Sequence, residues 1–538
     1  MLKNYNTLKT IKSWSPQLIE GGRLDVRKTF EVFIEKCKER WYLLLLAGIF
    51  FLALKIRLFT AGFQWLQAYD PYFHFRYLTY VFEYGRLPVW DPLSYFPPGR
   101  PIIHPPFMYY LTLGLKPVLD NFTSSLMGVA KYSTAVFGAA MTIPAYLLGK
   151  EFSDWKAGIL SAVFIGAIPA AMRRTMAGFY DTDALVLFFS LLTMYLFVKS
   201  YKTRNWNFYS LTVVSMILFS MTWMPAWYIA VLAVASTVVY FFVLSIMGKK
   251  DWEIKGEKMN IMPSLEKRMR KALTPAAKLL GISVVILILS AIASRLLGRT
   301  PFDTISNYLG FTTDPSSLQI VNISVAELQN LDIFGGAWKR LFSKVSVLLP
   351  FTFVGSILLL RKNRLSGSVL LTWTGFTFFF ITRGVRFMLI FAPAVSVSAG
   401  VAFSEIYRNL KKMGSSAALI SFGFLGSLFI SLQYPSMGFA IATALALIVF
   451  FYRNEGEVPE ISKPVILATA ILASIIVVSQ GVQMASAQQR EPLSEDWEEA
   501  YKFLKTNTSE DAVVGTWWDP GHRISTIGER RNMADGAH

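Results

Sequence analysis

Long apolar segments dominate this sequence, and they constrain its fold more than any other feature. About thirteen stretches are nearly free of charge and come close to the ~20 residues that an α-helix needs to cross a bilayer. They lie at residues 42–59, 126–148, 156–172, 184–200, 207–224, 226–247, 276–297, 343–360, 366–382, 385–405, 416–432, 435–452 and 463–482. Because backbone groups in lipid must be paired within the chain, we expect an all-α polytopic membrane protein with about 13 transmembrane helices.

The composition agrees with this class and excludes several others. The chain is 53% hydrophobic and only 16% charged, with a net charge of +18. In a soluble protein that charge would suggest nucleic acid. Here the basic residues cluster between apolar runs, above all at 249–271, so the positive-inside bias explains them and the bilayer is the expected partner. A single cysteine, Cys37, excludes a disulfide framework or a cysteine metal site within this chain.

The same bias gives an orientation and a domain plan. Residues 1–41 are polar and basic and are predicted to be a cytoplasmic tail, followed by a transmembrane catalytic domain at 42–484. Its two long external loops are 61–125 and 298–342. The polar residues 485–538 contain an amphipathic helix and a strand candidate, which predicts the start of an extracytoplasmic mixed α/β soluble domain.

An acidic and basic segment lies between the third and fourth apolar runs, at residues 173–183. It contains Arg174, Asp181 and Asp183. Charged side chains are costly at a membrane boundary and mark a functional site by default. Two carboxylates at i and i+2 in an extended backbone can reach one hard cation such as Mg²⁺ or Mn²⁺. The alternative is a polar loop in which Arg–Asp pairs only solvate the turn.

Three other polar residues fall in the external segments. Asp70 follows the first run directly and precedes Pro71, which also fits an Asp that caps a helix start. Glu327 ends the sequence Ser-Val-Ala-Glu in the loop 298–342, where a solvated Glu is the ordinary alternative. Arg386 opens the tenth run and is either a snorkelling arginine or an anion clamp.

The tail carries the sequence Trp517-Trp518-Asp519-Pro520-Gly521. Asp-Pro-Gly is typical of a turn, so we predict a turn that presents the two indoles and the carboxylate. The alternative is a buried Trp–Trp corner of the core. By the orientation above, this motif lies on the same side of the membrane as Asp70, Arg174, Asp181, Asp183, Glu327 and Arg386. Independent solvated residues would be divided between both faces, so their co-location favours one active site.

Together these residues resemble the catalytic subunit of oligosaccharyltransferase, most closely the archaeal single-subunit AglB type, which is related to bacterial PglB. The resemblance covers nearly the whole chain. The sequences around Asp70, Asp181 and Glu327 are similar to the acidic motifs of this family, and Arg386 to its donor-binding arginine. The chain departs from the family pattern at Ala68, where an acid is usual, and at Pro520, where Tyr is commoner.

The resemblance implies a GT-C type glycosyltransferase that acts on the extracytoplasmic face of the cell membrane. Such an enzyme transfers a glycan en bloc from a polyprenyl- or dolichyl-(pyro)phosphate to Asn in Asn-X-Ser/Thr sequons of an acceptor protein. It implies a Mn²⁺ or Mg²⁺ ion on Asp70, Asp181 and Asp183. The implied catalytic residues are Asp70, Arg174, Asp181, Asp183 and Glu327. The implied acceptor-binding residues are Asp70, Glu327, Trp517, Trp518 and Asp519. The implied donor-binding residue is Arg386.

Two rival functions remain at this point. Another polyprenyl-sugar-dependent glycosyltransferase, such as a protein O-mannosyltransferase, would share the external acids but does not need the Trp-Trp-Asp and Ser-Val-Ala-Glu motifs. A transporter of lipid-linked sugars would place charges near the membrane midplane and would show internal repeats. The charges here lie at the ends of the apolar runs, and no repeat is visible.

Overall fold

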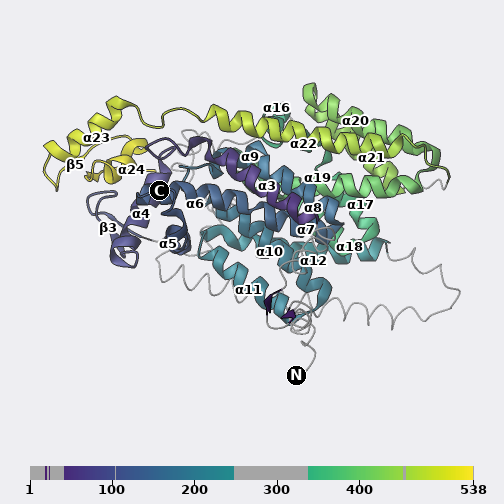
Figure 1. The fold of residues 1–538 in the computed structure, drawn as a ribbon, viewed down its shortest axis with the longest axis horizontal. Coiled ribbons are helices and arrows are strands. Elements are labelled where there is room, and N and C mark those ends of the chain that lie inside the picture. The colour runs from purple at the N-terminus through teal and green to yellow at the C-terminus, as the bar shows by residue number, and fades with distance from the viewer. Residues whose placement is uncertain are drawn as a thin grey trace.

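The computed structural model describes residues 19–20, 23–24, 41–102, 104–247, 337–451 and 456–536. Within these residues, long helices form a bundle, and a smaller lobe at one end combines residues 61–125 with the tail (Figure 1). The first half of the chain contributes β1 (Ile19–Glu20), β2 (Arg23–Leu24), α3 (Trp41–Arg57), η1 (Leu58–Thr60), α4 (Asp70–Tyr84), β3 (Trp90–Asp91), β4 (Arg100–Pro101), α5 (Phe107–Leu119), α6 (Leu126–Ala140), α7 (Thr142–Phe152), α8 (Trp155–Ala167), α9 (Pro169–Met172), η2 (Arg173–Thr175), α10 (Asp183–Thr203), α11 (Trp206–Ser220), η3 (Met224–Trp227) and α12 (Tyr228–Met247). The second half contributes α16 (Trp338–Val345), η5 (Ser346–Phe351), α17 (Val354–Lys362), α18 (Arg364–Ile381), η6 (Val385–Phe387), α19 (Met388–Asn409), η7 (Leu410–Lys412), η8 (Gly414–Ser416), α20 (Ala417–Gln433), α21 (Pro435–Phe451), α22 (Ser462–Ala487), α23 (Glu495–Asn507), β5 (Val513–Val514), α24 (Trp518–Thr526) and β6 (Arg531–Asn532).

The helices confirm the predicted class of multi-pass membrane protein. Among the described residues, eight helical segments are long and apolar enough to cross a bilayer, or nine if the bent pair α8 and α9 counts as one broken span. Each predicted apolar run overlaps a helix except 276–297, which lies outside the described residues. The helices α11 and α21 are apolar but shorter. The count of thirteen spans therefore stays a prediction.

The most buried helix is α19, which packs against α8, α17, α7 and α10. Small residues let these helices approach closely. A β-carbon at Gly355 of α17 would clash with the carbonyl of Ser398, and one at Gly400 would clash with Ser161 of α8. Small residues at helix interfaces are a common solution in membranes, where packing rather than the hydrophobic effect drives association.

Residues 61–125, the segment predicted to be the first external loop, contain two helices, α4 and α5, and the strands β3 and β4. Helices α4 and α5 pack together, and the antiparallel pair β3–β4 lies between them in the chain. The buried ion pair between Arg76 and Asp91 joins α4 to β3, with the two atoms 2.5 Å apart. This ion pair therefore holds β3 against α4 within the lobe.

The tail contains the predicted helix, α23, and the predicted strand, which is short. Strand β5 pairs in parallel with β6, and α24 lies between them in the chain. Figure 1 shows α23, β5 and α24, in yellow, at the same end of the molecule as α4, α5 and β3. The assignment of residues 485–538 to a separate soluble domain stays a prediction, as do the other domain boundaries.

Candidate active site

The acidic segment follows a break in a membrane-spanning helix. Helices α8 and α9 meet at an angle of 56°, because Ile168 leaves helical geometry just before Pro169. Arg57, from the end of α3, is fully buried there and donates to the Gly166 carbonyl (2.7 Å) and to Thr175 Oγ1 (2.9 Å). A cation inside a bundle is stable when backbone carbonyls accept its hydrogen bonds. The break and the following turn η2 are thus fixed to α3.

The acidic segment is also tied to the chain that leads to Asp70. The Ala177 amide donates to the Arg57 carbonyl (2.9 Å), and the Gln67 amide donates to the Gly178 carbonyl (2.9 Å). Gly178 has a φ of +92°, which only glycine adopts without strain. These bonds hold residues 173–183 against residues 58–67, so the segments carrying Asp181 and Asp70 lie side by side.

Asp181 is bound by a histidine from α4. His74 Nε2 lies 3.1 Å from Asp181 Oδ1, and His74 Nδ1 lies 2.9 Å from the Tyr109 hydroxyl. The Thr182 amide also donates to Oδ1 (2.6 Å). Burial alone would raise the pKa of the Asp181 carboxyl, but the hydrogen bond from His74 and the charges of His74 and Arg174 outweigh it and hold the pKa below its usual range. Asp181 is therefore a carboxylate at neutral pH.

Asp183 is paired with Arg174. Arg174 donates to Asp183 Oδ2 over 2.7 Å, and both side chains are partly exposed. Asp183 is the first residue of α10, where the amino-terminal end of a helix favours a negative charge. The two acids of the i, i+2 pair thus contact different side chains, Asp181 the His74 imidazole of α4 and Asp183 the Arg174 guanidinium of η2.

Asp70 begins α4, and the alternative interpretation of this residue as a helix cap is wrong. Tyr69 occupies the cap position, and no side chain accepts a hydrogen bond there, while Asp70 and Pro71 form the first turn. Asp70 therefore contributes to the helix through its charge rather than through a cap. His74 follows one turn later on the same face, so Asp70 lies next to the residue that holds Asp181.

The Trp-Trp-Asp motif begins a helix, which corrects the predicted turn. Helix α24 starts at Trp518, and Trp517 precedes it with 68% of its surface exposed. Pro520 is tolerated because the amides of a helix's first turn have no intrahelical acceptor. Burial raises the pKa of the Asp519 carboxyl. Consequently Asp519 and Trp518 project from the first turn of a helix, not from a loop.

Helix α24 brings this motif to Asp70. It packs on α4, where Thr526 Oγ1 donates to the Tyr72 carbonyl (3.0 Å) and His522 contacts Phe73 with 5.2 Å between ring centres. A β-carbon placed on Gly536 would lie 3.5 Å from each of three atoms, Asp70 Oδ1, His522 Nε2 and Trp518 Cε3. Asp70 and Trp518 therefore line one small region although 448 positions separate them in the chain (518 minus 70).

Burial also sets the charge of the histidine in this region. It lowers the pKa of His522 to about 3, with help from the positive charges of Arg76 and Arg100. His522 is therefore neutral over the physiological range.

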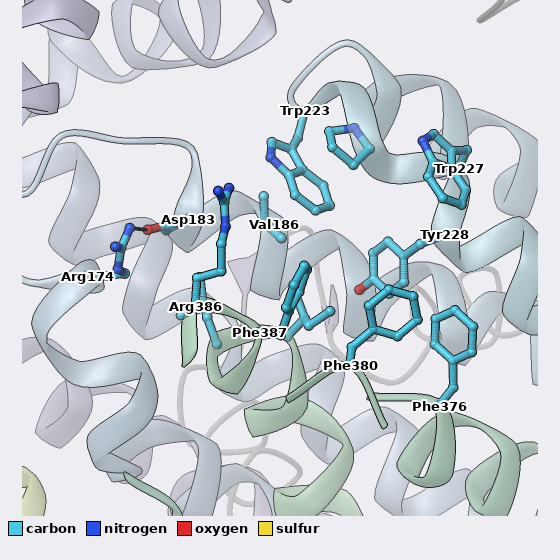
Figure 2. A pocket seen from close by; sticks show the side chains of 13 residues that line it. Arg174, Asp183, Val186, Trp223, Trp227, Tyr228, Phe376, Phe380, Arg386 and Phe387 are labelled. Atoms are coloured by element: carbon cyan, nitrogen blue, oxygen red, sulfur yellow. Dashed lines mark hydrogen bonds and ion pairs between the residues drawn. The ribbon is translucent and has the colours of Figure 1, made fainter. Parts of the chain in front are cut away.

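On the other side of the acidic segment, Arg174 and Asp183 open onto a cavity of about 100 Å³. Figure 2 shows Arg386, from η6, beside this ion pair, and aromatic rings from η3, α12 and α18 along the remaining wall. The lining residues are Arg174, Asp183, Val186, Trp223, Pro225, Trp227, Tyr228, Phe376, Phe380, Arg386, Phe387, Leu389 and Ile390. Two guanidinium groups at one end and an apolar wall suit a ligand with an anionic head and a hydrocarbon chain.

Glu327 lies outside the described residues, as does most of the external loop 298–342. Its predicted role is neither supported nor opposed by the geometry of the other site residues.

Comparison with known proteins decides the family. The profile of oligosaccharyl transferase STT3, N-terminal, matches residues 41–452, which is most of the chain. The chain belongs to the oligosaccharyl transferase STT3 family.

Named relatives of this STT3-family chain occur in plants and archaea. It is 25% identical to subunit STT3B of the dolichyl-diphosphooligosaccharide–protein glycosyltransferase of Arabidopsis thaliana, over 91% of this chain and 73% of that protein. It is also 25% identical to dolichyl-phosphooligosaccharide-protein glycotransferase 2 of Pyrococcus horikoshii, over 92% of this chain and 66% of that one. The family assignment places the chain among membrane-bound glycosyltransferases.

Solved structures give the same fold. The apo oligosaccharyltransferase of Archaeoglobus fulgidus superimposes with a TM-score of 0.64 at 18% identity, covering 93% of this chain and 65% of that one. The present chain thus spans about 65% of the length of that protein. Other structures of the A. fulgidus protein contain dolichol-phosphate with an inhibitory peptide, a tethered acceptor peptide with the sequon NVT, or Zn and sulfate (TM-scores of 0.62, 0.62 and 0.55).

The donor atoms of this STT3-family site suit a divalent cation. Asp70, Asp181 and Asp183 offer carboxylate oxygens, the ligands that Mg²⁺ and Mn²⁺ prefer. In the part of the chain that the structure describes, no three His, Cys, Asp or Glu side chains are grouped closely enough to hold an ion. Asp181 and Asp183 contact His74 and Arg174 instead. Binding an ion would therefore require these carboxylates to exchange their present contacts with His74 and Arg174.

Sequence reasoning missed His74, Tyr109 and the aromatic wall of the cavity. The spacing of His74, four residues after Asp70, was a usable signal because helical residues at i and i+4 share a face. Tyr109 and the wall residues Trp223 and Trp227 carried no such signal, since aromatic residues are common at membrane interfaces.

Proposed function

We propose that this chain transfers a preassembled oligosaccharide from a polyprenyl- or dolichyl-(pyro)phosphate to the asparagine amide of Asn-X-Ser/Thr sequons. One observation carries the proposal. The acidic segment 173–183 has a cationic, aromatic cavity on one side and, through His74, the region shared by Asp70 and Trp518 on the other. A transferase needs a donor site and an acceptor site that meet at a few charged groups, and this arrangement provides both.

The cavity is the proposed donor site. Arg386 and Arg174 would bind the (pyro)phosphate, since guanidinium groups match phosphate oxygens with two parallel hydrogen bonds. The wall of Trp223, Trp227 and Phe380 would contact the first hydrocarbon units of the lipid. The dolichol-phosphate bound to the A. fulgidus relative supports this class of donor.

The region beside Asp70 is the proposed acceptor site. The carboxylates of Asp70 and Glu327 would accept hydrogen bonds from the asparagine amide and so hold and polarise a nitrogen whose lone pair is delocalised. Trp517, Trp518 and Asp519 would recognise the Ser or Thr hydroxyl of the sequon. A site built to bind a hydroxyl discriminates strongly against acceptors that lack it. The NVT peptide tethered to the A. fulgidus relative supports this class of acceptor.

The reaction is proposed as a single displacement. The amide nitrogen forms a bond to the anomeric carbon while the bond from that carbon to the phosphate oxygen breaks. The electron pair leaves with the lipid (pyro)phosphate, one amide proton passes to a carboxylate or to water, and the anomeric configuration inverts. Arg386 and Arg174 stabilise the charge that develops on the leaving oxygen, which is a form of electrostatic catalysis.

A divalent cation on Asp70, Asp181 and Asp183, with Mn²⁺ or Mg²⁺ proposed, would supply further charge stabilisation to the leaving group. The Zn and sulfate of the A. fulgidus structure support a metal site in this fold without fixing the ion. The site is proposed to lie on the extracytoplasmic face, where the positive-inside bias places the loops of all seven candidate residues or motifs.

The proposal is tested with membranes that contain the chain, a lipid-linked oligosaccharide and a fluorescent Asn-X-Thr peptide. We expect glycopeptide formation, its loss with EDTA, its return with Mn²⁺ or Mg²⁺, and a fall of at least about 100-fold for Asp181→Asn. Asp120→Asn is the matched control, because Asp120 is exposed at the end of α5 and forms an ion pair with Lys116 one turn earlier.

Three results would refute the proposal. They are equal transfer to a peptide with Gln in place of Asn, a glycan found on Ser or Thr, and transfer that survives both EDTA and Asp181→Asn. The second result would instead identify a protein O-glycosyltransferase.

A further inference from the structure

Arg523 connects three segments that are far apart in the chain. It lies in α24, five residues after Trp518, and only 6% of its surface is exposed. Its Nη2 donates to the carbonyl of Ala68 (3.1 Å) and to the carbonyl of Pro492 (3.0 Å). Ala68 directly precedes the pair Tyr69-Asp70, and Pro492 belongs to the linker between α22 and α23. One guanidinium group thus joins the tail, its linker and the start of α4.

Aromatic rings hold this guanidinium group in place. Its central carbon lies 4.4 Å from the ring centre of Tyr69 and 5.1 Å from that of Tyr72. A cation against two ring faces is stabilised more strongly when it is desolvated, as Arg523 is. The planar guanidinium group can stack and donate at the same time, which a lysine ammonium cannot.

The carbonyl that Arg523 binds belongs to a strained residue. Ala68 has a φ of +62°, in the left-handed region that side chains other than glycine rarely adopt. The chain turns there so that Asp70 can begin α4. Without a bond to its carbonyl, Ala68 would relax toward a more favourable φ and would carry Tyr69 and Asp70 with it.

We propose that Arg523 is a positioning residue that fixes Asp70 relative to Trp518 and Asp519. It touches neither substrate in the mechanism above, and it acts by holding Ala68 in its left-handed conformation against α24. The consequence for transfer rests on the proposed function, whereas the consequence for the conformation of residues 64–72 does not.

The chain offers a matched control in Arg530. This arginine is also buried, with 5% of its surface exposed, and it also donates to backbone carbonyls, those of Lys505 (2.6 Å) and Thr508 (2.8 Å). Both carbonyls lie within the tail. Loss of Arg530 therefore removes a comparable set of bonds without affecting Ala68.

The first test is hydrogen exchange of the amides of residues 64–72 in the full chain in nanodiscs. Arg523→Gln should accelerate their exchange about tenfold, whereas Arg530→Gln should leave it unchanged. The expected factor corresponds to the loss of one hydrogen bond from a charged group. Adding Ala68→Gly to Arg523→Gln should not restore the slow exchange of these amides, because the hydrogen bond to the residue 68 carbonyl is still missing. It should restore part of the acceptor binding in the transfer test below, because glycine adopts the left-handed conformation without strain.

The second test is peptide transfer by the same variants. Arg523→Gln should raise the KM for the Asn-X-Thr peptide about tenfold, leave the KM for the lipid-linked donor within twofold, and reduce the preference for Thr over Ala at the third sequon position. Arg523→Lys should recover little, and the Ala68→Gly double variant should recover part of the loss. Arg530→Gln should change neither the donor KM nor the Thr preference.

The inference is overturned if exchange at 64–72 is the same in Arg523→Gln and the unmodified chain, or if Arg530→Gln accelerates it equally. If transfer by the unmodified chain meets one of the three results that refute the proposed function, the exchange experiment still decides the inference.

Discussion

The cavity beside Arg386 and the region beside Asp70 share one acidic segment but are held in place by different contacts. The cavity is lined by the helices α10, α12, α18 and α19 and by the short turns η2, η3 and η6 beside them, whose positions follow from packing within the helix bundle. The Asp70 region exists because α24 docks on α4 through Thr526, Arg523 and the ring of His522. The difference teaches that the proposed donor site is part of the bundle, whereas the proposed acceptor site depends on a few directional bonds from the tail.

The two kinds of contact respond differently to substitution. Helix packing is spread over many side chains, so a single change in the cavity should alter ligand binding without moving the cavity. A docked segment held by a few hydrogen bonds, each contributing roughly 0.5–1.5 kcal/mol, should shift when one bond is lost. Substitutions of Arg386, Trp518 and Thr526 should therefore have different effects on binding and on docking.

Arg386→Met should have the largest effect and should act on the donor alone. Removing one charged partner of a phosphate costs about 1.5–3 kcal/mol, so the KM for the lipid-linked donor should rise roughly 10- to 150-fold while the KM for the peptide stays within twofold. Arg383→Met is the control, because Arg383 lies on the same turn, contacts Phe379 and does not line the cavity. Equal effects of both variants on the donor KM would contradict a donor site at Arg386.

Trp518→Leu should have an intermediate effect and should act on the acceptor. The KM for an Asn-X-Thr peptide should rise about tenfold, and discrimination between Thr and Ala at the third position should fall, because the hydroxyl-binding site loses one wall. The control is Trp497→Leu in α23, where the indole stacks on Tyr501 and is half-exposed. A Trp518 variant that keeps its preference for Thr would contradict a role of α24 in sequon recognition.

Thr526→Val should have the smallest effect. The substitution removes the hydroxyl that donates to the Tyr72 carbonyl, and the valine side chain otherwise has the same shape as threonine. The docking of α24 should weaken by roughly 1 kcal/mol, which is about a fivefold change in exchange rates of the α24 amides. Thr506→Val, which removes a hydroxyl bound only within α23, is the control. If both variants leave the exchange of α24 unchanged, the hydroxyl of Thr526 does not help to hold the tail.

The sequence predicted those features that depend on local patterns. The apolar runs within the described residues identified the apolar helices, eight or nine of which are long enough to cross a bilayer. Arg174, Asp181 and Asp183 stood out because charges at a span boundary are costly, and the amphipathic pattern identified α23. The resemblance to the catalytic subunit of oligosaccharyltransferase, of the archaeal AglB type, then linked these separate motifs to one family.

Contacts between distant segments could not be predicted in the same way. Nothing in the spacing of residues reveals that His74 binds Asp181 or that Arg523 binds Ala68, because these pairs are set by how helices pack. The turn predicted at Asp519-Pro520 failed for a related reason. Proline breaks a helix when it lies in the helix interior, but it is tolerated in the first turn. The packing of α24 on α4 favours a helix whose first turn contains Pro520, and local sequence does not reveal that packing.

The buried Arg57 has a consequence for how the bundle assembles. In lipid, a guanidinium group on α3 and an unpaired Gly166 carbonyl at the end of α8 are each unfavourable, and the hydrogen bond between them forms only when the two helices meet. The choice of neighbour for α3 is therefore dictated by polarity as well as by shape. Helix α3 precedes α8 in the chain and carries the guanidinium group that the Gly166 carbonyl of the interrupted helix needs as a donor. This hydrogen bond therefore helps α8 to pair with α3.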